Sequence, residues 1–219
     1  MKNKNFIIVL IGQIISLLGN IIQRFCLSLL ILELTGSAAI FSSILAISSL
    51  PYIVFAPIAG LLADTKNRKK IMVYLDVFSG IIMGLFALVI DRHNSTFVIA
   101  CIMFLLSVIY TLYSPSVLAC IPQIVPENKL TFANGMIQQV GYWVNFLGPM
   151  LGGLLYSIIN IKWIVIINAL SFLAAAMMEL FLEIPDLEGN KKIKNPFITS
   201  MKEMKRSFLY LKEKNRVVL

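Results

Sequence analysis

The sequence predicts an all-α, polytopic membrane protein with six transmembrane helices. Of its 219 residues, 58% are hydrophobic and 14% are charged, and the mean hydropathy is +0.86. A soluble domain has about 25% charged residues, and a disordered chain is far less apolar. This composition excludes a soluble enzyme. Because a membrane-spanning helix needs about 20 apolar residues, a chain of this length has room for about six spans.

Six charge-poor runs delimit the expected helices. They cover residues 6–32, 38–62, 71–90, 97–121, 132–159 and 163–182. The runs are continuously apolar and lack the alternation of outer-membrane β-strands, so each predicts a helix that crosses the bilayer. The connections between them are short, and residues 1–184 are therefore expected to form one six-helix domain.

Residues 185–219 differ in composition and are expected to form a basic cytoplasmic linker. Apolar residues recur there at helical spacing beside lysines and arginines, at Phe197, Met201, Met204, Phe208 and Leu211. This pattern fits an amphipathic helix at the membrane interface, and it fits a solvated linker equally well.

The distribution of Lys and Arg predicts the orientation. With a cytoplasmic N-terminus, sixteen of the 19 basic residues fall on the cytoplasmic side, Arg92 and Lys162 fall outside, and Arg24 lies within a span. Cytoplasmic loops carry the excess of positive charge. Both termini are therefore predicted to be cytoplasmic, in a multi-pass protein of the cell membrane.

The formal net charge of +8 does not indicate nucleic-acid binding, because the cations lie between long apolar runs. The sequence also carries no signal of an enzyme. Its one histidine, His93, lies in an outer loop, the three cysteines are dispersed, and no span pairs carboxylates or metal ligands. We therefore expect no catalytic residue, metal or cofactor.

The loop between the second and third spans combines a glycine, a carboxylate and a basic cluster. Its residues are Gly60, Asp64, Arg68, Lys69 and Lys70. Asp64 can accept hydrogen bonds from a helix N-terminus, and the cations can meet helix C-termini or anionic lipid. Two interpretations remain open. The loop is either a lock that forms in one conformation of the protein and breaks in another, or a positively charged anchor that keeps this side in the cytoplasm.

The fifth span contains small residues around a proline, namely Gly148, Pro149, Gly152 and Gly153, with Gly135 further upstream. Pro149 removes a backbone donor and permits a kink, while Gly148 and Gly152 lie on one face. Ordinary helix packing also explains such glycines, including Gly80 and Gly84 in the third span.

Both segments resemble motifs of the major facilitator superfamily. The loop is similar to its signature cytoplasmic loop, although Thr65 and Asn67 replace an expected basic residue and glycine. The fifth span is similar to the antiporter motif, with Val144 in place of the middle glycine.

Further stretches lie at residues 13–20, at 33–37, and at 121–126 followed by Leu130, Ala133 and Asn134. They resemble the macrolide-efflux and siderophore-exporter branch of the drug:proton antiporters, and the likeness spans essentially the whole chain. The resemblance implies the N-terminal six-helix half of the fold, with Asp64 and its cations gating the cytoplasmic side. It also implies that the Gly-Pro span controls leak and direction, and that substrate passes between two halves.

Polar residues within the spans are the candidates for a substrate or ion cavity. They are Asn20, Gln23, Arg24, Tyr113, Gln138 and Asn145. A charge at the centre of a span costs about 2.5 to 3.5 kcal/mol on insertion scales. Arg24 is therefore expected either to face a cavity or to snorkel outward, while the other side chains serve a cavity or packing.

Glu33, Asp76 and Glu179 are the candidate charge partners within or beside the spans. Asp76 lies a turn or more inside the third span and Glu179 lies near the cytoplasmic end of the sixth, and both are expected to pair with the basic loops. The fourth span contains no charge, whereas many proton-coupled relatives carry an arginine there. A proton gradient as energy source is therefore an expectation from the resemblance.

Two functions follow as hypotheses. The first is a secondary transporter that exports small organic molecules by alternating access, with this chain as a truncated or half-length form. Its partners are a small-molecule substrate, the lipid bilayer of a bacterial cytoplasmic membrane, and a C-terminal six-helix half or a second copy. The alternative is a non-transporting six-helix module that oligomerises or pairs through its glycine faces.

Overall fold

The computed structural model describes residues 4–90 and 95–184, and this part of the chain contains α-helices and one short 3-10 helix. The helices are α1 (Lys4–Thr35), α2 (Ala38–Ile47), α3 (Leu50–Thr65), α4 (Arg68–Val89), α5 (Thr96–Ile124), η1 (Glu127–Lys129), α6 (Leu130–Ile158) and α7 (Ile161–Leu180). The predicted all-α class is confirmed. The basic linker predicted at 185–219 lies outside the described residues.

The second predicted span consists of two helices. α2 ends at Ile47 and α3 begins at Leu50, with Pro51 in the first turn of α3. Proline lacks the amide hydrogen that would continue the ladder of α2. The hydroxyls of Ser48 and Ser49 donate to the carbonyls of Ile44 and Leu45 at 2.7 and 3.1 Å. The expected second span is therefore present, over Ala38–Thr65, but its helix is interrupted at Ser48 and Ser49.

Five segments of the described chain are long and apolar enough to cross a membrane. They are α1, α2 with α3, α4, α5 and α7. The sixth expected span, α6, is a helix of 29 residues without a charged side chain. Its amides, among them Gln138, Gln139 and Asn145, and its glycines lower its hydropathy.

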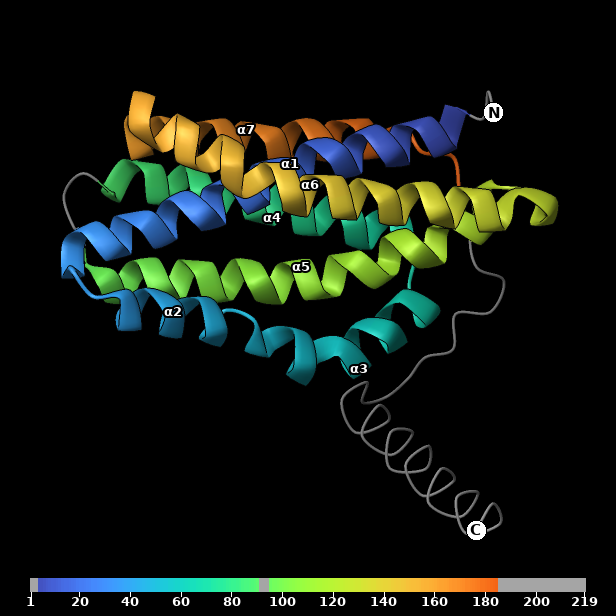
Figure 1. Cartoon of the computed structure of the whole chain (residues 1–219). Coiled ribbons are helices and arrows are strands. Elements are labelled where there is room, and N and C mark those ends of the chain that lie inside the picture. Colours follow the sequence, from blue (N-terminus) through green and yellow to red (C-terminus); the bar gives the residue numbers. More distant parts are fainter. Residues whose placement is uncertain (1–3, 91–94, 185–219) are drawn as a thin grey trace, which may run out of the picture.

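The helices form a bundle in which their long axes run side by side (Figure 1). α1 lies against α2, α5, α6 and α7, while α4 packs between α5 and α7. α2 and α3 form one edge of the bundle, where α3 packs on α5.

The beginning and the end of the described chain meet at one end of the bundle. The Asn5 side-chain amide donates to the Glu183 carbonyl at 2.8 Å, and the Glu183 amide donates back to Asn5 Oδ1 at 3.3 Å. α1 therefore starts at the end of the bundle where α7 finishes, as six crossings require. Which side of the membrane this face occupies remains a prediction.

Two apolar clusters fill the bundle, with polar side chains between them. One cluster includes Leu27, Ile31, Met83 and Phe86, and the other includes Phe6, Val9, Met72, Val117 and Ile121. Between these positions along α1 and α4 lie Ser16, Asp76 and Ser79, which are all buried. The fold therefore holds a polar layer in its interior, and this layer positions the candidate site.

Candidate functional site

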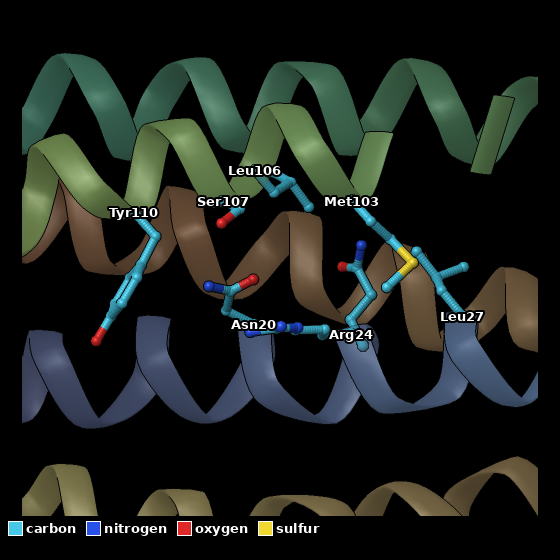
Figure 2. A pocket seen from close by; sticks show the side chains of 8 residues that line it. Asn20, Arg24, Leu27, Met103, Leu106, Ser107 and Tyr110 are labelled. Carbon is cyan, nitrogen blue, oxygen red and sulfur yellow. The ribbon is translucent and has the colours of Figure 1, made fainter. Parts of the chain in front are cut away.

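A cleft between α1 and α5 contains the intramembrane arginine (Figure 2). The space in it that water can enter is about 30 Å³. The lining residues come from these two helices: Asn20, Gln23, Arg24, Leu27, Met103, Leu106, Ser107 and Tyr110. The site thus combines an arginine, two amides and two hydroxyls with an apolar wall, the kinds of group that orient a small organic molecule. In this structure its free space suffices for about two water molecules.

Arg24 reaches from α1 to the junction of α2 and α3. Its Nη2 donates to the Leu45 carbonyl at 3.2 Å and to Ser49 Oγ at 3.0 Å. The Leu45 carbonyl belongs to the last turn of α2, where a cation is favoured. Arg24 Nε is buried and has no hydrogen-bond partner among the described residues. The guanidinium therefore lies at the cleft and retains an unused donor.

Gln23 lines the cleft and is fully buried among α1, α4 and α7. Its carbonyl accepts a hydrogen bond from the Asn168 side-chain amide, and its own amide lies 3.1 Å from Met83 Sδ. Ser171 Oγ donates to Asn168 Oδ1 at 3.1 Å. These contacts make Gln23 part of an interhelical network, and Asn168 is a member that sequence reasoning missed.

Asp76 and Glu179 lie in the polar layer, each bonded to a hydroxyl. Ser16 Oγ donates to Asp76 Oδ1 at 3.2 Å, and the Tyr113 hydroxyl donates to Glu179 Oε1 at 2.7 Å. The sequence led us to expect basic loops as their partners. The actual partners are neutral side chains on α1 and α5, because both carboxylates point into the bundle.

A second, smaller cavity, with about 10 Å³ of space for water, lies next to the arginine cleft and reaches this layer. Its lining residues are Ser16, Asn20, Asp76, Ser79, Leu106, Ile109, Tyr110, Tyr113 and Phe172. Asn20, Leu106 and Tyr110 line both cavities. The two cavities are therefore neighbours along the α1–α5 seam, and polar side chains extend from Arg24 to Asp76.

Gln138 and Asn145 lie elsewhere. Both are exposed on α6, and the Asn145 side-chain amide donates to the Gly141 carbonyl at 2.8 Å. Neither lines the cavities described above. The six cavity candidates thus separate into an interior group on α1 and α5 and an outer pair on α6.

Gly148 and Gly152 are the contact points of α6 with α1. A Cβ atom at Gly148 would lie 2.5 Å from Ile21 Cγ2, and one at Gly152 would lie 3.2 Å from the Ile22 carbonyl oxygen. Cys26 Sγ donates to the Gly152 carbonyl at 3.2 Å. Gly135 has no such neighbour within 4 Å. Two glycines of the Gly-Pro segment therefore serve close helix packing.

Pro149 and Gly153 follow the same helix without so close an approach. Pro149 lies inside the continuous helix α6. A Cβ at Gly153 would have Phe25 as its neighbour, at the ordinary contact distance of 3.7 Å. Of the glycines in this segment, the structure thus gives Gly148 and Gly152 the tightest packing.

The basic loop between α3 and α4 binds helix ends. Arg68 Nε donates to the Ala63 carbonyl at 2.9 Å, and Lys69 Nζ donates to the carbonyls of Leu180 and Leu182, both at 2.7 Å. These carbonyls lie in the last turns of α3 and α7 or just beyond, where a cation satisfies acceptors that lack helical partners.

Three other members of the loop motif face outward. Asp64 and Lys70 are exposed, and a Cβ at Gly60 would meet no atom within 4 Å. The Asp64 carboxylate makes no hydrogen bond within residues 4–90 and 95–184. Gly60 and Asp64 are thus free to contact a further helical segment.

Glu33 lies at the opposite end of α1 and is exposed. The Tyr156 hydroxyl of α6 donates to Glu33 Oε2 at 2.5 Å. This contact ties the end of α1 to the end of α6. In the described part of the chain, no three His, Cys, Asp or Glu residues gather into a group that could hold a metal ion.

Comparisons with known proteins agree with this architecture. The family model of the Major Facilitator Superfamily matches residues 9–214. Macrolide efflux protein A of Streptococcus pyogenes is 29% identical over 196 residues, covering 88% of this chain and 48% of the relative. Macrolide efflux protein A of Enterococcus faecalis is 30% identical over 172 residues, covering 77% of this chain and 52% of the relative.

A third relative is the multi-drug resistance efflux pump PmrA of Streptococcus pneumoniae. It is 26% identical over 140 residues, covering 64% of this chain and 34% of the pump. The chain spans about half the length of the macrolide efflux relatives it matches. No solved structure gives a significant match.

Proposed function

This chain belongs to the Major Facilitator Superfamily, and from that premise we propose that it works as the N-terminal half of an exporter of small organic molecules. It is a multi-pass membrane transporter related to efflux proteins. The observation that carries the proposal is the Arg24 cleft, where a buried guanidinium nitrogen without a partner lies beside amides, hydroxyls and apolar side chains.

A second six-helix half completes the proposed transporter. It is supplied by a longer chain, by another chain or by a second copy. The matched relatives are about twice as long, and the exposed polar residues Asp64, Gln138 and Asn145 are available for contact. Substrate then passes between the halves as they rock against each other. The bacterial cytoplasmic membrane is the proposed location, because the relatives named above are bacterial.

Macrolides are the first substrates to test, since two relatives bear that name. We propose a proton gradient as the energy source, because the resemblance is to drug:proton antiporters and the polar layer contains titratable groups. The protein is proposed to act without an enzymatic step, metal or cofactor.

The test expresses the chain in a macrolide-susceptible bacterium, alone and together with the C-terminal half of the Streptococcus pyogenes relative as a separate polypeptide. Accumulation of a radiolabelled macrolide is measured with and without a protonophore. We expect lower accumulation with both halves and restoration of accumulation by the protonophore. Equal accumulation in all strains, with both halves present in the membrane, would favour the non-transporting module instead.

Arg24→Ala tests the cleft within the same assay. A hydrogen bond to a charged group is worth about 1.5 to 3 kcal/mol, so export at subsaturating macrolide is expected to fall about tenfold or more. Ile53→Ala is the matched control, because Ile53 is 74% exposed on α3 and lies outside the cleft. Unchanged export in the Arg24 variant would remove this residue from the substrate site.

A further inference from the structure

Two acidic side chains are buried together inside the bundle. Asp76 of α4 is 3% exposed and Glu179 of α7 is fully buried. α4 and α7 pack along each other, and Tyr113, whose hydroxyl bonds Glu179, lines the same cavity as Asp76. A pair of carboxyl groups in such a position needs a physical explanation, because burial of an unpaired charge is costly.

Each carboxyl group has one hydrogen-bond donor and one oxygen left over. Ser16 donates to Asp76 Oδ1 and Tyr113 donates to Glu179 Oε1. Asp76 Oδ2 and Glu179 Oε2 are buried and have no partner among the described residues. Two buried oxygens therefore lack the hydrogen that would satisfy them.

The helices packed around the pair supply neutral groups. α1 contributes Ser16 and the backbone of Gly12, whose added Cβ would lie 4.0 Å from Glu179 Cγ. α5 contributes the titratable side chains of Tyr110, Tyr113 and Cys120. No Lys or Arg donates to either carboxyl group in the part of the chain that the structure describes.

Two cations lie further along the bundle. Arg68 lies on the loop side of the pair, and its Nε donates to the Ala63 carbonyl. Arg24 lies at the other end of the seam, bonded to Leu45 and Ser49. Since neither donates to the pair, two ionised carboxylates here would repel each other in a medium of low dielectric constant.

We propose that Asp76 and Glu179 form a proton-binding site that holds at least one proton at neutral pH. Protonation converts one carboxylate into a neutral carboxyl group, which removes the repulsion between the two groups and the cost of burying a second charge. Like charges at close range cannot both persist, so the two groups titrate as a pair rather than independently.

The two cavities suggest the route by which protons reach this site. Asp76 and Tyr113 line the inner cavity, which shares Asn20 and Tyr110 with the Arg24 cleft. Water that reaches the inner cavity brings a proton donor or acceptor next to Asp76. If the proposed exporter function holds, on which this last step rests, the pair is where the proton that drives export binds.

The site is tested without transport, by infrared difference spectroscopy of the purified full chain in phosphatidylglycerol nanodiscs as pH is varied in potassium buffer. A protonated carboxyl group has a carbonyl stretch that a carboxylate lacks. We expect this band at pH 7, and we expect both Asp76→Asn and Glu179→Gln to remove its pH-dependent part. Glu33→Gln is the matched control, since Glu33 is exposed at the far end of α1.

Tyr113→Phe keeps the test decisive if an acid-site variant does not fold. It removes the donor to Glu179 and leaves both acids in place, so the band is expected to shift to higher frequency. An absent band in the wild type, or a band unchanged by Asp76→Asn, Glu179→Gln and Tyr113→Phe, would overturn the site. Loss of the band when Na⁺ replaces K⁺ at constant pH would also overturn it, by showing a metal-cation site.

The outcome is separable from the exporter proposal, because the measurement needs neither substrate nor a second half. A band with the expected sensitivity in a chain that never exports macrolide supports the proton site while the exporter fails. Export by a chain without the band leaves the exporter standing and removes the proton site.

Discussion

Gly148 shows how one missing side chain sets the distance between two helices. It is buried on α6, and the atoms opposite it belong to Ile21 of α1. Ile21 is β-branched, so its Cγ2 atom cannot turn away without changing the rotamer of the whole side chain. Small residues permit such close approach between membrane helices, whose association depends on packing rather than on hydrophobic transfer.

Gly148→Ala is predicted to destabilise the bundle. The new Cβ would lie 2.5 Å from Ile21 Cγ2, and overpacking of this kind costs about 1 to 3 kcal/mol. A lower thermal unfolding temperature in detergent is the expected result. Gly135→Ala is the control on the same helix, because a Cβ there meets nothing within 4 Å and alanine favours the helix. Equal unfolding temperatures for the two variants would contradict this packing role.

The candidate site shows what residue patterns can and cannot predict. The cost of an intramembrane charge singled out Arg24, Asp76 and Glu179 from the sequence alone. Their partners could not be predicted in this way, because helices that meet in space are distant in sequence, as Tyr113 is from Glu179. Asn168 gave no signal, since an amide within an apolar span is equally compatible with several faces.

At the scale of elements, the loop between α3 and α4 acts as a clamp on α7. Lys69 donates to two carbonyls at the end of that helix, while the neighbouring Lys70 is exposed. Asn67 begins α4 by accepting a hydrogen bond from the Lys70 amide at 3.1 Å, as an N-cap does. The same short segment thus caps the N-terminus of α4 and binds carbonyls at the C-terminal ends of α3 and α7.

Lys69→Met is predicted to fray the end of α7. The substitution keeps the apolar stem and removes the cation from two carbonyls, and a charge at a helix terminus contributes about 0.3 to 1 kcal/mol. Faster hydrogen exchange over residues 178–184 is the expected measurement. Lys70→Met is the matched control and should leave this exchange unchanged. Identical exchange in both variants would show that the Lys69 contacts do not hold the helix end.

Hydropathy predicted the helical segments well because length and apolarity are properties of each segment by itself. The break between α2 and α3 was missed, although Ser48, Ser49 and Pro51 are all turn or helix-start residues. The prediction followed the uninterrupted apolar run over 38–62, because hydropathy gives these three residues little weight. Helix boundaries depend on where backbone donors and acceptors find partners, which hydropathy does not describe.

At the scale of the whole molecule, charge and polarity divide the bundle along its length. The basic loop and the paired ends of α1 and α7 lie at one face, an apolar cluster fills each half, and the acid pair lies between the clusters. The polar layer is therefore insulated from both faces by apolar packing. The inner cavity and the Arg24 cleft lie next to each other along the α1–α5 seam.

The same division predicts orientation, since cytoplasmic segments hold the excess of Lys and Arg. Exposed Ser95, before α5, should lie outside the cell, and exposed Lys66, after α3, should lie inside. Starting from a Cys101→Ser background, Ser95→Cys should react with an impermeant maleimide in intact cells. Lys66→Cys should react only after permeabilisation, and the background chain, whose Cys26 and Cys120 are buried, should stay unlabelled. The reverse pattern would invert the bundle and place its basic loop outside the cell. This would contradict the rule that loops rich in Lys and Arg stay in the cytoplasm.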